Sequence, residues 1–569
     1  MAGSSKGRGK KSAPSVKAPG PRVNTPLFFL LAALLLFFGG YYDFLVFAAA
    51  AVLAVLLALH ARRTGGLTLP KGPVPWLLLG LVLCALLTLP AAVSPGMALT
   101  GVLRWLAALL FFLYAATFTQ EERGLMLDSV AWQGAIMAVL SVCLFLGTLL
   151  SGGQDANGRI DGFFQYANTY ALFLLVCLAL LAGKDRRQRL DWPAMAALLV
   201  GLFLTGSRGV FLLLAAAGVC WAVYRLVVKK QVRPVLLGTA GVVLAAALAV
   251  VFSGGMVLDR LEAITLESSS LNGRLLYYLD GLRMLAQCPF GVGRGGYLYL
   301  QPLVQTGPYI LKSIHNEYLQ AALDGGILSG VLLLALVCAV VFRRGAPPRE
   351  RVVAALLGLH ACIDFDFQFF AMLCLLLLCG VGGERRTVAV KKPAVLAAGG
   401  ILTAVFAFFT LPYSLSFFGN SRGAYALWPV DLSLAEERLQ HCADLDEAGE
   451  IADAILCQTS LSMLAWDCKF AQAAAAADYP SMTSYRYQYL QLNPYRPEVY
   501  EEMTTLLENA CDQAPEGLDL YQTLAEQTAR LLEEVYARTS PLAYKIADRP
   551  DFSFRPALLI RLETITEER

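Results

Sequence analysis

Long apolar runs recur along the first 412 residues, and they constrain the fold of this chain more than any other feature. A helix needs about 20 mostly apolar residues to cross the hydrocarbon core of a bilayer. Thirteen runs approach this length, and the first, seventh, eleventh and twelfth are the shortest: 25–39, 42–60, 74–91, 97–118, 126–150, 167–183, 192–206, 209–227, 234–253, 316–342, 351–364, 366–382 and 393–412. Because backbone polar groups in lipid must be bonded internally, we expect an all-α, polytopic transmembrane bundle of about 12–13 spans.

Composition and charge divide the chain in the same way. Charged residues make up only 16% of the 569 residues, against about 25% in soluble domains, which excludes a soluble enzyme, a disordered chain and a collagen-like fibre. Residues 1–412 carry 34 Lys and Arg against 18 Asp and Glu, whereas residues 413–569 carry 12 against 25. We therefore expect a basic tail over 1–24, a membrane domain over 25–412 with a long loop at 254–315, and an acidic domain over 413–569.

Basic residues fall in every second loop, which predicts the orientation. The positive-inside rule puts such loops in the cytoplasm, and the first of them is a tail that precedes an uncleaved helix rather than a signal peptide. The basic segments are Lys6 to Arg22, Arg62-Arg63 with Lys71, Arg123, Lys184 to Arg189, Lys229 to Arg233, Arg343 to Arg351 and Arg385 to Lys392. The loop 151–166, the stretch 254–315 and the whole of 413–569 are then extracytoplasmic. Because the basic residues form no stripe, nucleic acid is not an expected partner.

The acidic domain is predicted to be helical. Apolar positions follow helical spacing over Leu434–Leu439, Ile451–Ala465, Ser481–Leu492, Pro497–Ala510 and Leu518–Tyr536. The stretch 487–500 joins a helix end, a proline-rich turn and a new helix, and it resembles the joint between two tetratricopeptide repeats. Since no clean period of about 34 residues is visible, a helical-repeat-like domain and an irregular helical domain both stay open.

Arginines at the predicted outer ends of helices are the first candidate site residues. Arg208 opens a helix after the tight turn Thr205-Gly-Ser. A guanidinium fixed there can hold a phosphate in a bidentate manner. The alternative is structural, with Ser207 as a helix cap and Arg208 reaching the membrane interface. Arg104, about two turns into its helix, is also long enough to reach that interface.

A second group lies in the long outer loop. Asn272-Gly-Arg274 precedes a predicted helix over 275–288, and Gly291-Val-Gly-Arg294-Gly-Gly follows it. The glycines match GxGxxG, but no strand or βαβ unit surrounds them, which excludes a dinucleotide site. Backbone N–H groups at Gly291 and Gly293 can still approach an anion, although the glycines can equally form a simple flexible turn.

Two histidines stand near the predicted outer surface. His315, with Asn316, begins a long apolar helix, and a neutral imidazole there suits removal of a proton from a hydroxyl; the alternative is a polar interface residue without chemistry. His360 and Asp364 are one helical turn apart and can share a face. Two ligands do not make a metal site, so we expect a structural pair, and we expect no metal and no cofactor.

The cations gather on one side of the predicted membrane. Arg159, in a loop that ends at Asn168, joins Arg208, Arg274, Arg294 and His315 on the outer side. Guanidinium groups and one imidazole facing a common cavity suit a lipid-linked pyrophosphate donor. Membrane lipid and such a donor are therefore the expected partners.

The order of these motifs resembles the O-antigen ligase and polymerase superfamily. The matching motifs are the Ser-Arg-Gly turn, Asn-Gly-Arg in a long outer loop, Pro289-Phe-Gly-Val-Gly, and His-Asn before a long helix. The loop 159–168 is similar to an R-x-x-G-x-F…N signature, and 364–366 resembles the Asp-Phe-Asp of a later helix. The resemblance covers roughly residues 25–385.

The resemblance implies a membrane glycosyltransferase of the bacterial cell envelope. Superfamily members transfer a glycan from undecaprenyl pyrophosphate to an acceptor, with inversion and without nucleotide sugar or metal. Carried onto this chain, the resemblance assigns Arg208 and Arg274 to the pyrophosphate, His315 to the acceptor hydroxyl or the donor phosphates, and Arg159 to auxiliary binding. Asn168 and Asn316 enter with their motifs. Arg294, Gly291 and Gly293 are added from charge and backbone geometry.

Several functions remain open at this point. A ligase with a lipid, wall-polymer or protein acceptor and a polymerase of repeat units would share donor and site. A polyprenyl-lipid transporter is less favoured, because no inverted repeat is visible and the cations collect at the outer edge. A scaffold would need only one or two spans. The acidic domain departs from simple ligases and could recruit an acceptor or a protein partner.

Overall fold

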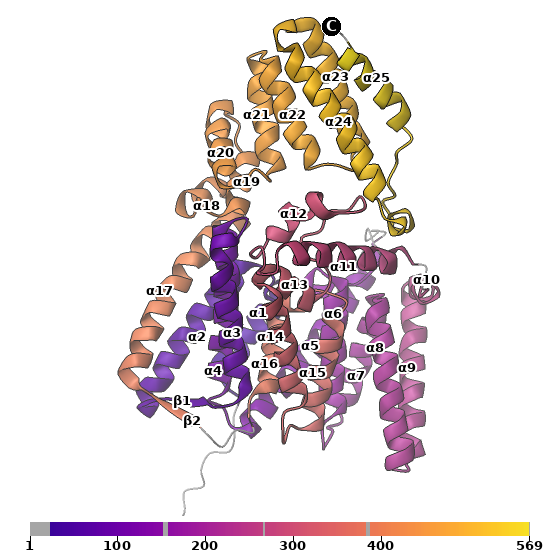
Figure 1. Cartoon of the computed structure of the whole chain (residues 1–569). Helices are drawn as coiled ribbons and strands as arrows, with labels where there is room; N and C mark the ends of the chain where they lie inside the picture. The colour runs from indigo at the N-terminus through magenta and orange to yellow at the C-terminus, as the bar shows by residue number, and fades with distance from the viewer. Residues whose placement is uncertain (1–22, 152–157, 266–267, 383–386, 568–569) are drawn as a thin grey trace, which may run out of the picture.

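The computed structural model describes residues 23–151, 158–265, 268–382 and 387–567. The tail with Lys6 to Arg22, and Arg385, lie outside them. The described residues form a tall helical bundle with a smaller group of helices, α18–α25, beyond one end (Figure 1). We call this end of the bundle the C-domain end and the opposite one the far end. The predicted all-α, polytopic architecture is confirmed.

The bundle consists of helices that coincide with the apolar runs. They are α1 (Thr25–Leu36), α2 (Asp43–Thr64), α3 (Pro73–Thr88), α4 (Pro95–Ala115), α5 (Gln120–Leu150), α6 (Ala167–Ala182), α7 (Asp191–Leu204), α8 (Arg208–Val223), α9 (Val232–Phe252), α13 (Glu317–Gly325), α14 (Ile327–Val341), α15 (Pro348–His360), α16 (Phe370–Gly380) and α17 (Lys392–Phe417). Within the described residues, seven helices are long and apolar enough to cross a membrane, and five shorter apolar helices accompany them. A span count of 12–13 stays a prediction.

The expected single helix over 316–342 is wrong, because the chain breaks between α13 and α14. Gly326 adopts φ +86°, a left-handed conformation that favours glycine. A Cβ there would lie 3.0 Å from the backbone of Phe290, and the Ile327 N–H donates to the Pro289 carbonyl at 3.0 Å. The glycine-rich loop therefore packs into the break. Apolar periodicity continues across this point, so it gives no sign of the interruption.

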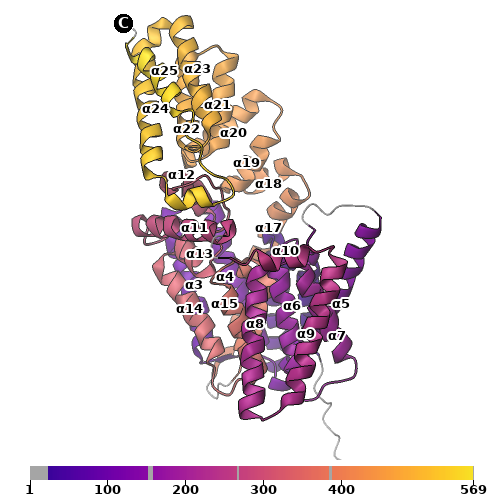
Figure 2. The same cartoon turned by 90° about the vertical axis from the view of Figure 1, so that its right-hand side faces the viewer.

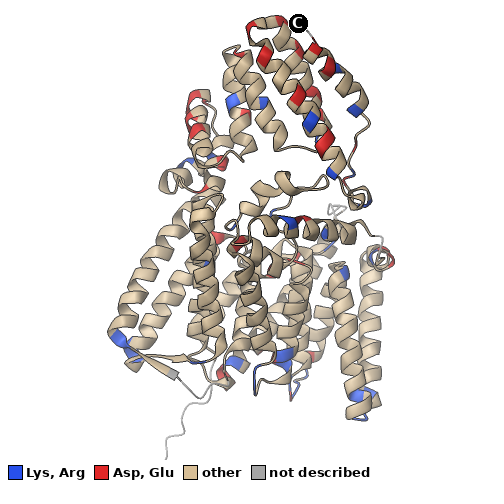
Figure 3. Cartoon of the chain, in the orientation of Figure 1, with Lys and Arg blue, Asp and Glu red and all other residues tan. Residues whose placement is uncertain are grey.

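A two-stranded sheet closes the far end of the bundle. Strand β1 (Gly66–Pro70) pairs antiparallel with β2 (Thr387–Lys391), in a register that joins Gly66 to Lys391. The pairing ties the end of α2 to the start of α17, and these two helices pack side by side (Figure 1). Lys and Arg mark the loops at the far end, whereas Asp and Glu collect on the helices beyond the C-domain end (Figure 3).

Three helices from the long loop cover the C-domain end of the bundle (Figure 2). They are α10 (Met256–Glu262), α11 (Ser269–Gln287) and α12 (Gly296–Val304). The helix predicted over 275–288 begins earlier, because the Ser268 side chain caps it at the Leu271 N–H. Arg274 consequently projects from a rigid helix and not from the loop before it.

The C-terminal part has eight described helices, and each of the first five begins after a residue whose side chain caps it. They are α18 (Ser421–Leu427), α19 (Leu432–Gln440), α20 (Leu445–Gln458), α21 (Met463–Ala475), α22 (Tyr479–Gln491), α23 (Pro497–Gln513), α24 (Leu518–Arg538) and α25 (Arg555–Glu567). The single helix expected over 451–465 is wrong, because Thr459 leaves the helical conformation and Ser462 caps a new helix. From α20 onward each helix packs against the next. Relation to tetratricopeptide repeats stays a prediction.

These helices are joined to the covering layer of the bundle by polar contacts. The Leu432 N–H donates to Ser94 Oγ at 3.2 Å, beside the start of α4. The Tyr299 hydroxyl, on α12, donates to Glu436 at 2.7 Å. The Arg538 guanidinium donates to the Pro302 carbonyl at 3.1 Å. The C-terminal helices therefore rest directly on the elements that cover the C-domain end.

Candidate functional site

A single buried carboxylate, Asp364, gathers side chains from three other segments of the chain. It lies in the turn after α15, at the C-domain end. Its Oδ1 accepts from the Tyr166 hydroxyl at 2.9 Å and lies 3.2 Å from His315 Nδ1. Its Oδ2 accepts from Asn168 Nδ2 at 2.9 Å and from the Arg274 guanidinium at 3.2 Å. A carboxylate with this many donors is held in one orientation and stays ionised.

His315 is placed by the start of α13. Its backbone adopts φ +56°, which is uncommon for a residue other than glycine. The next residue, Asn316, caps the helix through a 3.0 Å bond from the Leu319 N–H, and its amide donates to the Cys362 carbonyl at 3.0 Å. The cap thus fixes the start of α13 against the end of α15. The His-Asn pair brings the imidazole to Asp364 by this means, at the expense of local backbone strain.

The imidazole of His315 is oriented for proton transfer. Its Nδ1 faces Asp364, and its ring lies 5.0 Å from that of Phe365. A proton on Nδ1, bonded to the carboxylate, makes Nε2 the basic nitrogen of the neutral ring. The side chain is 21% exposed. The ring is therefore partly accessible from solvent, and its Nδ1 is the nitrogen that faces Asp364.

Arginines crowd beside this centre. Arg159 donates from Nε to the Thr205 carbonyl at 2.6 Å and from a terminal nitrogen to Asn168 Oδ1 at 3.0 Å. Burial lowers the pKa of the Arg159 guanidinium below its ordinary value, and the charges of Arg260 and Arg208 lower it further. Like charges in partial burial repel one another, so this group would be stabilised by an anion.

The Ser-Arg-Gly turn positions Arg208 in the same region. Gly206 adopts φ +62°, and a Cβ on it would lie 3.3 Å from the Arg260 side chain and 3.5 Å from Arg159 Nε. Arg208 itself donates to the Ala263 carbonyl at 2.9 Å. The turn therefore lies close against the side chains of Arg159 and Arg260. The alternative in which Ser207 caps the helix through its side chain is not supported, because its side chain makes no cap hydrogen bond.

Tyr166 is a residue of the centre that sequence reasoning did not single out. Its ring packs 4.7 Å from that of Phe365, and its hydroxyl donates to Asp364 and accepts from Asn168 at 3.2 Å. Burial, and then the charge of Asp364, raises the pKa of the tyrosine well above its ordinary value. It consequently remains a proton donor. The only available sequence signal was its position within the 159–168 motif.

The expected pairing of His360 with Asp364 is wrong. His360 Nδ1 lies 2.6 Å from Asp366 Oδ2, and the Thr169 hydroxyl donates to Asp366 Oδ1 at 2.8 Å. The helix ends at His360, and the following turn directs Asp364 toward α11 and α13 instead. The Asp-Phe-Asp motif therefore serves two histidines, with Asp364 on His315 and Asp366 on His360.

The glycine-rich loop does not present free amides to an anion. The Gly291 N–H donates to the Cys288 carbonyl at 3.0 Å, and the Gly293 N–H donates to the Asp324 carbonyl at 3.2 Å. Both glycines have positive φ, and a Cβ on either would come within 2.5 Å of a neighbouring atom. The loop thus needs glycine for close packing, and we omit Gly291 and Gly293 from the site proposed below.

Arg294 and Arg104 belong to a different cluster from the Asp364 centre. Each forms an ion pair with Asp43, Arg294 at 2.8 Å and Arg104 at 2.7 Å. The Arg104 side chain is only 10% exposed. The expectation that it extends to the membrane interface is therefore wrong, because its guanidinium is retained inside the bundle by a carboxylate.

The fold and the site together define a polytopic α-helical membrane protein with an arginine-rich His-Asp centre at one end of its bundle. In the described part of the chain, His, Cys, Asp and Glu side chains form no group of three or more that could hold a metal ion.

Comparison with known families supports the resemblance to O-antigen ligases. A family model described as O-antigen ligase matches residues 193–334, a segment that includes Arg208, Arg274 and His315. The resemblance to the O-antigen ligase superfamily is thereby confirmed over this segment. No curated protein and no solved structure matches the chain. Arg159, Asn168 and Asp364 lie outside the matched segment, and the tertiary structure brings them to it.

Proposed function

We propose that this chain is a ligase-like membrane glycosyltransferase that moves a glycan from undecaprenyl pyrophosphate to an acceptor hydroxyl. The observation that carries the proposal is the convergence of His315, Arg274 and Asn168 on Asp364, with Arg159 and Arg208 alongside. A base oriented by a carboxylate next to crowded guanidinium groups provides both requirements of the reaction, which are deprotonation of the acceptor and neutralisation of a pyrophosphate leaving group.

The arginines would hold the pyrophosphate. Guanidinium groups match phosphate oxygens with paired N–H donors, and charge-assisted bonds of this kind are about twice as strong as neutral ones. Arg274 projects from α11 with 21% of its side chain exposed, so it can exchange part of its contact with Asp364 for a phosphate. Arg159 and Arg208 would receive the second phosphate and relieve their mutual repulsion.

The bond changes need only one base. The acceptor oxygen attacks the anomeric carbon from the face opposite the pyrophosphate, and its proton passes to His315 Nε2. The bond from the anomeric carbon to the pyrophosphate oxygen breaks, and the electron pair leaves with the pyrophosphate. A single displacement inverts the anomeric configuration. The positive charge that the leaving group requires comes from arginines, so we propose that the reaction is metal-independent.

We also propose that the site faces the outside of the bacterial cytoplasmic membrane. The positive-inside rule favours a cytoplasmic position for the basic loops of the far end (Figure 3). One of them joins α14 to α15 and contains Arg343 and Arg344. The N-terminal tail would then be cytoplasmic and residues 413–569 extracytoplasmic. The acidic helices stand over the C-domain end, where they are suited to recruit an acceptor or a protein partner.

A transfer assay with purified protein in lipid nanodiscs tests the proposal. The substrates are undecaprenyl-pyrophosphate glycan and a series of acceptors, and the product is the glycoside together with undecaprenyl pyrophosphate. We expect Arg274→Ala and His315→Ala to abolish transfer and Arg349→Ala, at the far end beside Asp128, to retain it. Wild-type activity in both site variants would remove the proposal.

Deletion of the gene distinguishes a ligase from a polymerase. Polymer of full length stranded on the lipid carrier identifies the ligase reaction. Single repeat units on the carrier would identify the polymerase reaction at the same site. Movement of labelled polyprenyl lipid between leaflets by reconstituted protein, without any glycoside, would identify a transporter.

A further inference from the structure

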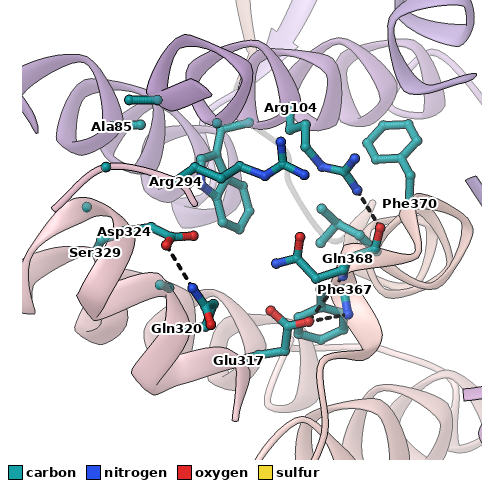
Figure 4. A pocket seen from close by; sticks show the side chains of 17 residues that line it. Ala85, Arg104, Arg294, Glu317, Gln320, Asp324, Ser329, Phe367, Gln368 and Phe370 are labelled. Carbon is teal, nitrogen blue, oxygen red and sulfur yellow. Dashed lines mark hydrogen bonds between the residues drawn. The ribbon is translucent and has the colours of Figure 1, made fainter. Parts of the chain in front are cut away.

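A second polar space opens beside the Asp364 centre, and the chemistry proposed above does not use it. It is a pocket of about 680 Å³ of empty space, part of it open to solvent, between α4, the glycine-rich loop, α13 and the turn that leads into α16. The side chains of Arg104, Arg294, Glu317 and Asp324 point into it (Figure 4).

One wall of the pocket is rigid and its cations are already neutralised. Asp43 bonds Arg104 through Oδ1 at 2.7 Å and Arg294 through Oδ2 at 2.8 Å. Arg104 also donates to the Tyr41 carbonyl at 3.2 Å and to the Gln368 carbonyl. Each guanidinium carries five N–H donors in a plane, so donors remain for a ligand after these bonds are made.

The opposite wall presents the carboxylates of Glu317 and Asp324, which form no ion pair of 4.0 Å or less with the described residues. Glu317 is only 3% exposed, and both of its backbone bonds, from the Phe367 and Gln368 N–H groups, go to Oε1. Its Oε2 is turned toward the pocket (Figure 4). Asp324 accepts from Gln320 Nε2 at 2.8 Å and faces Arg294 across the pocket (Figure 4).

The balance of charge selects the class of ligand. Among the described residues of this cluster, two guanidinium groups stand against three carboxylates, those of Asp43, Glu317 and Asp324. A pyrophosphate finds a larger excess of cations at the arginines around Asp364 than in this pocket. A neutral ligand rich in hydroxyl groups fits instead, because carboxylates accept and guanidinium groups donate to adjacent hydroxyls.

Apolar surface completes this match to a sugar. Trp105, Phe367 and Phe370 also line the pocket. Pockets for small ligands combine such apolar surface with a few convergent polar groups. An aromatic face can cover the C–H side of a pyranose ring while its hydroxyls reach the polar groups on either wall.

We propose that this pocket binds a neutral sugar ring of the glycan substrate, an inference that rests on the proposed function. The pocket shares two walls with the Asp364 centre. Glu317 follows His315 by two residues at the start of α13, and Gln368 lies in the same turn as Asp364. A glycan whose pyrophosphate lies among the arginines could therefore place a sugar in the pocket, and so could an acceptor glycan.

The test compares a sugar-bearing and a sugar-free ligand of the full-length protein in nanodiscs. Asp324→Asn removes one charge, and its side-chain oxygen can still accept from Gln320. Because a charge-assisted bond to a sugar hydroxyl is lost, we expect the ligand that carries the sugar to bind about tenfold more weakly. Affinity for undecaprenyl pyrophosphate without sugar is expected to be unchanged, and Arg274→Ala is expected to lower it. Asp128→Asn, the same change at the far end, is the matched control.

The KM values show whether the donor or the acceptor glycan enters the pocket. The binding measurements separate failure of the pocket proposal from failure of the proposed function. A rise in KM for the donor glycan alone assigns the pocket to the donor, and a rise for the acceptor alone assigns it to the acceptor. Trp105→Leu is expected to act in the same direction, which covers the case in which Asp324→Asn fails to fold. If wild-type protein is active and both variants have unchanged KM values, the proposal that the pocket binds a sugar ring is overturned. Wild-type protein that binds no undecaprenyl pyrophosphate and transfers nothing overturns the proposed function, and binding of the free glycan then still tests the pocket.

Discussion

Replacement of Asp364 by asparagine changes the charge of the centre while it keeps the shape. The carboxylate is buried, and both oxygens accept hydrogen bonds. An asparagine amide would turn its NH₂ group either toward the hydroxyl of Tyr166 and the ring of His315 or toward the donors of Arg274 and Asn168. In either orientation donor groups face one another, so at least one of the present bonds is lost.

The size of the effect follows from the charge separation. Unit charges about 3.2 Å apart attract by roughly 5 kcal/mol at an effective dielectric constant of about 20. This attraction acts on His315 only after the ring has taken a proton, so it stabilises the transition state and not the resting enzyme. If an amide dipole recovers about half of it, the barrier rises by roughly 2.6 kcal/mol and kcat falls by on the order of 100-fold.

The assay is single-turnover transfer with saturating lipid-linked donor, together with thermal unfolding of each variant. We expect Asp364→Asn to lose about 100-fold in rate, with a smaller change in donor affinity, because Arg159 and Arg208 remain in place. The control Asp128→Asn removes a carboxylate that pairs with Arg349 and should leave the rate unchanged. A folded Asp364→Asn protein with a rate within about threefold of wild type would refute the role of this carboxylate.

Three further outcomes are expected. Arg208→Lys should reduce donor binding and transfer by at least tenfold in nanodisc assays, since an ammonium group cannot form the paired bonds of a guanidinium; equal donor affinity of the two proteins would contradict a bidentate contact. Tyr166→Phe removes one donor to Asp364 and should slow transfer about tenfold while the melting temperature falls by a few degrees at most; a rate equal to wild type would show that the hydroxyl is dispensable. Gly326→Ala introduces a Cβ 3.0 Å from the Phe290 backbone at φ +86° and should destabilise the protein by about 1–3 kcal/mol in thermal unfolding; an unchanged melting temperature would mean that the break between α13 and α14 tolerates a side chain.

The motif order included most members of the centre, Asp364 among them, but it did not predict that Asp364 organises the others. Arg208 and His315 were identifiable because they stand at the ends of apolar runs. Arg274, Arg159 and Asn168 were identifiable from short motifs in the predicted outer loops. The partnership of Asp364 with His315 was not, since the two residues lie 49 positions apart. The local spacing of His360 and Asp364 suggested a different pair, and helical periodicity does not reveal where a helix ends in a turn.

Arg294 shows that the predicted side of the membrane does not by itself predict which site a residue joins. Its predicted position was compatible with the pyrophosphate site, but Asp43 engages it together with Arg104 and creates a separate pocket. A partner of this kind, 251 positions away, is selected by packing. Charge and sidedness along a chain restrict which groups can meet, and they do not specify which carboxylate each cation reaches.

The sequence by itself determined the helical character of the apolar runs and the residue types that the centre draws on. Apolar runs allow few alternatives, because a backbone in lipid must satisfy its own hydrogen bonds. Only the tertiary structure decided that α13 and α14 separate at Gly326, that Asp364 joins four segments, and that Arg104 and Arg294 line a pocket apart from Asp364. These features depend on contacts between distant segments, and close packing at a few glycines and one buried carboxylate selects among them.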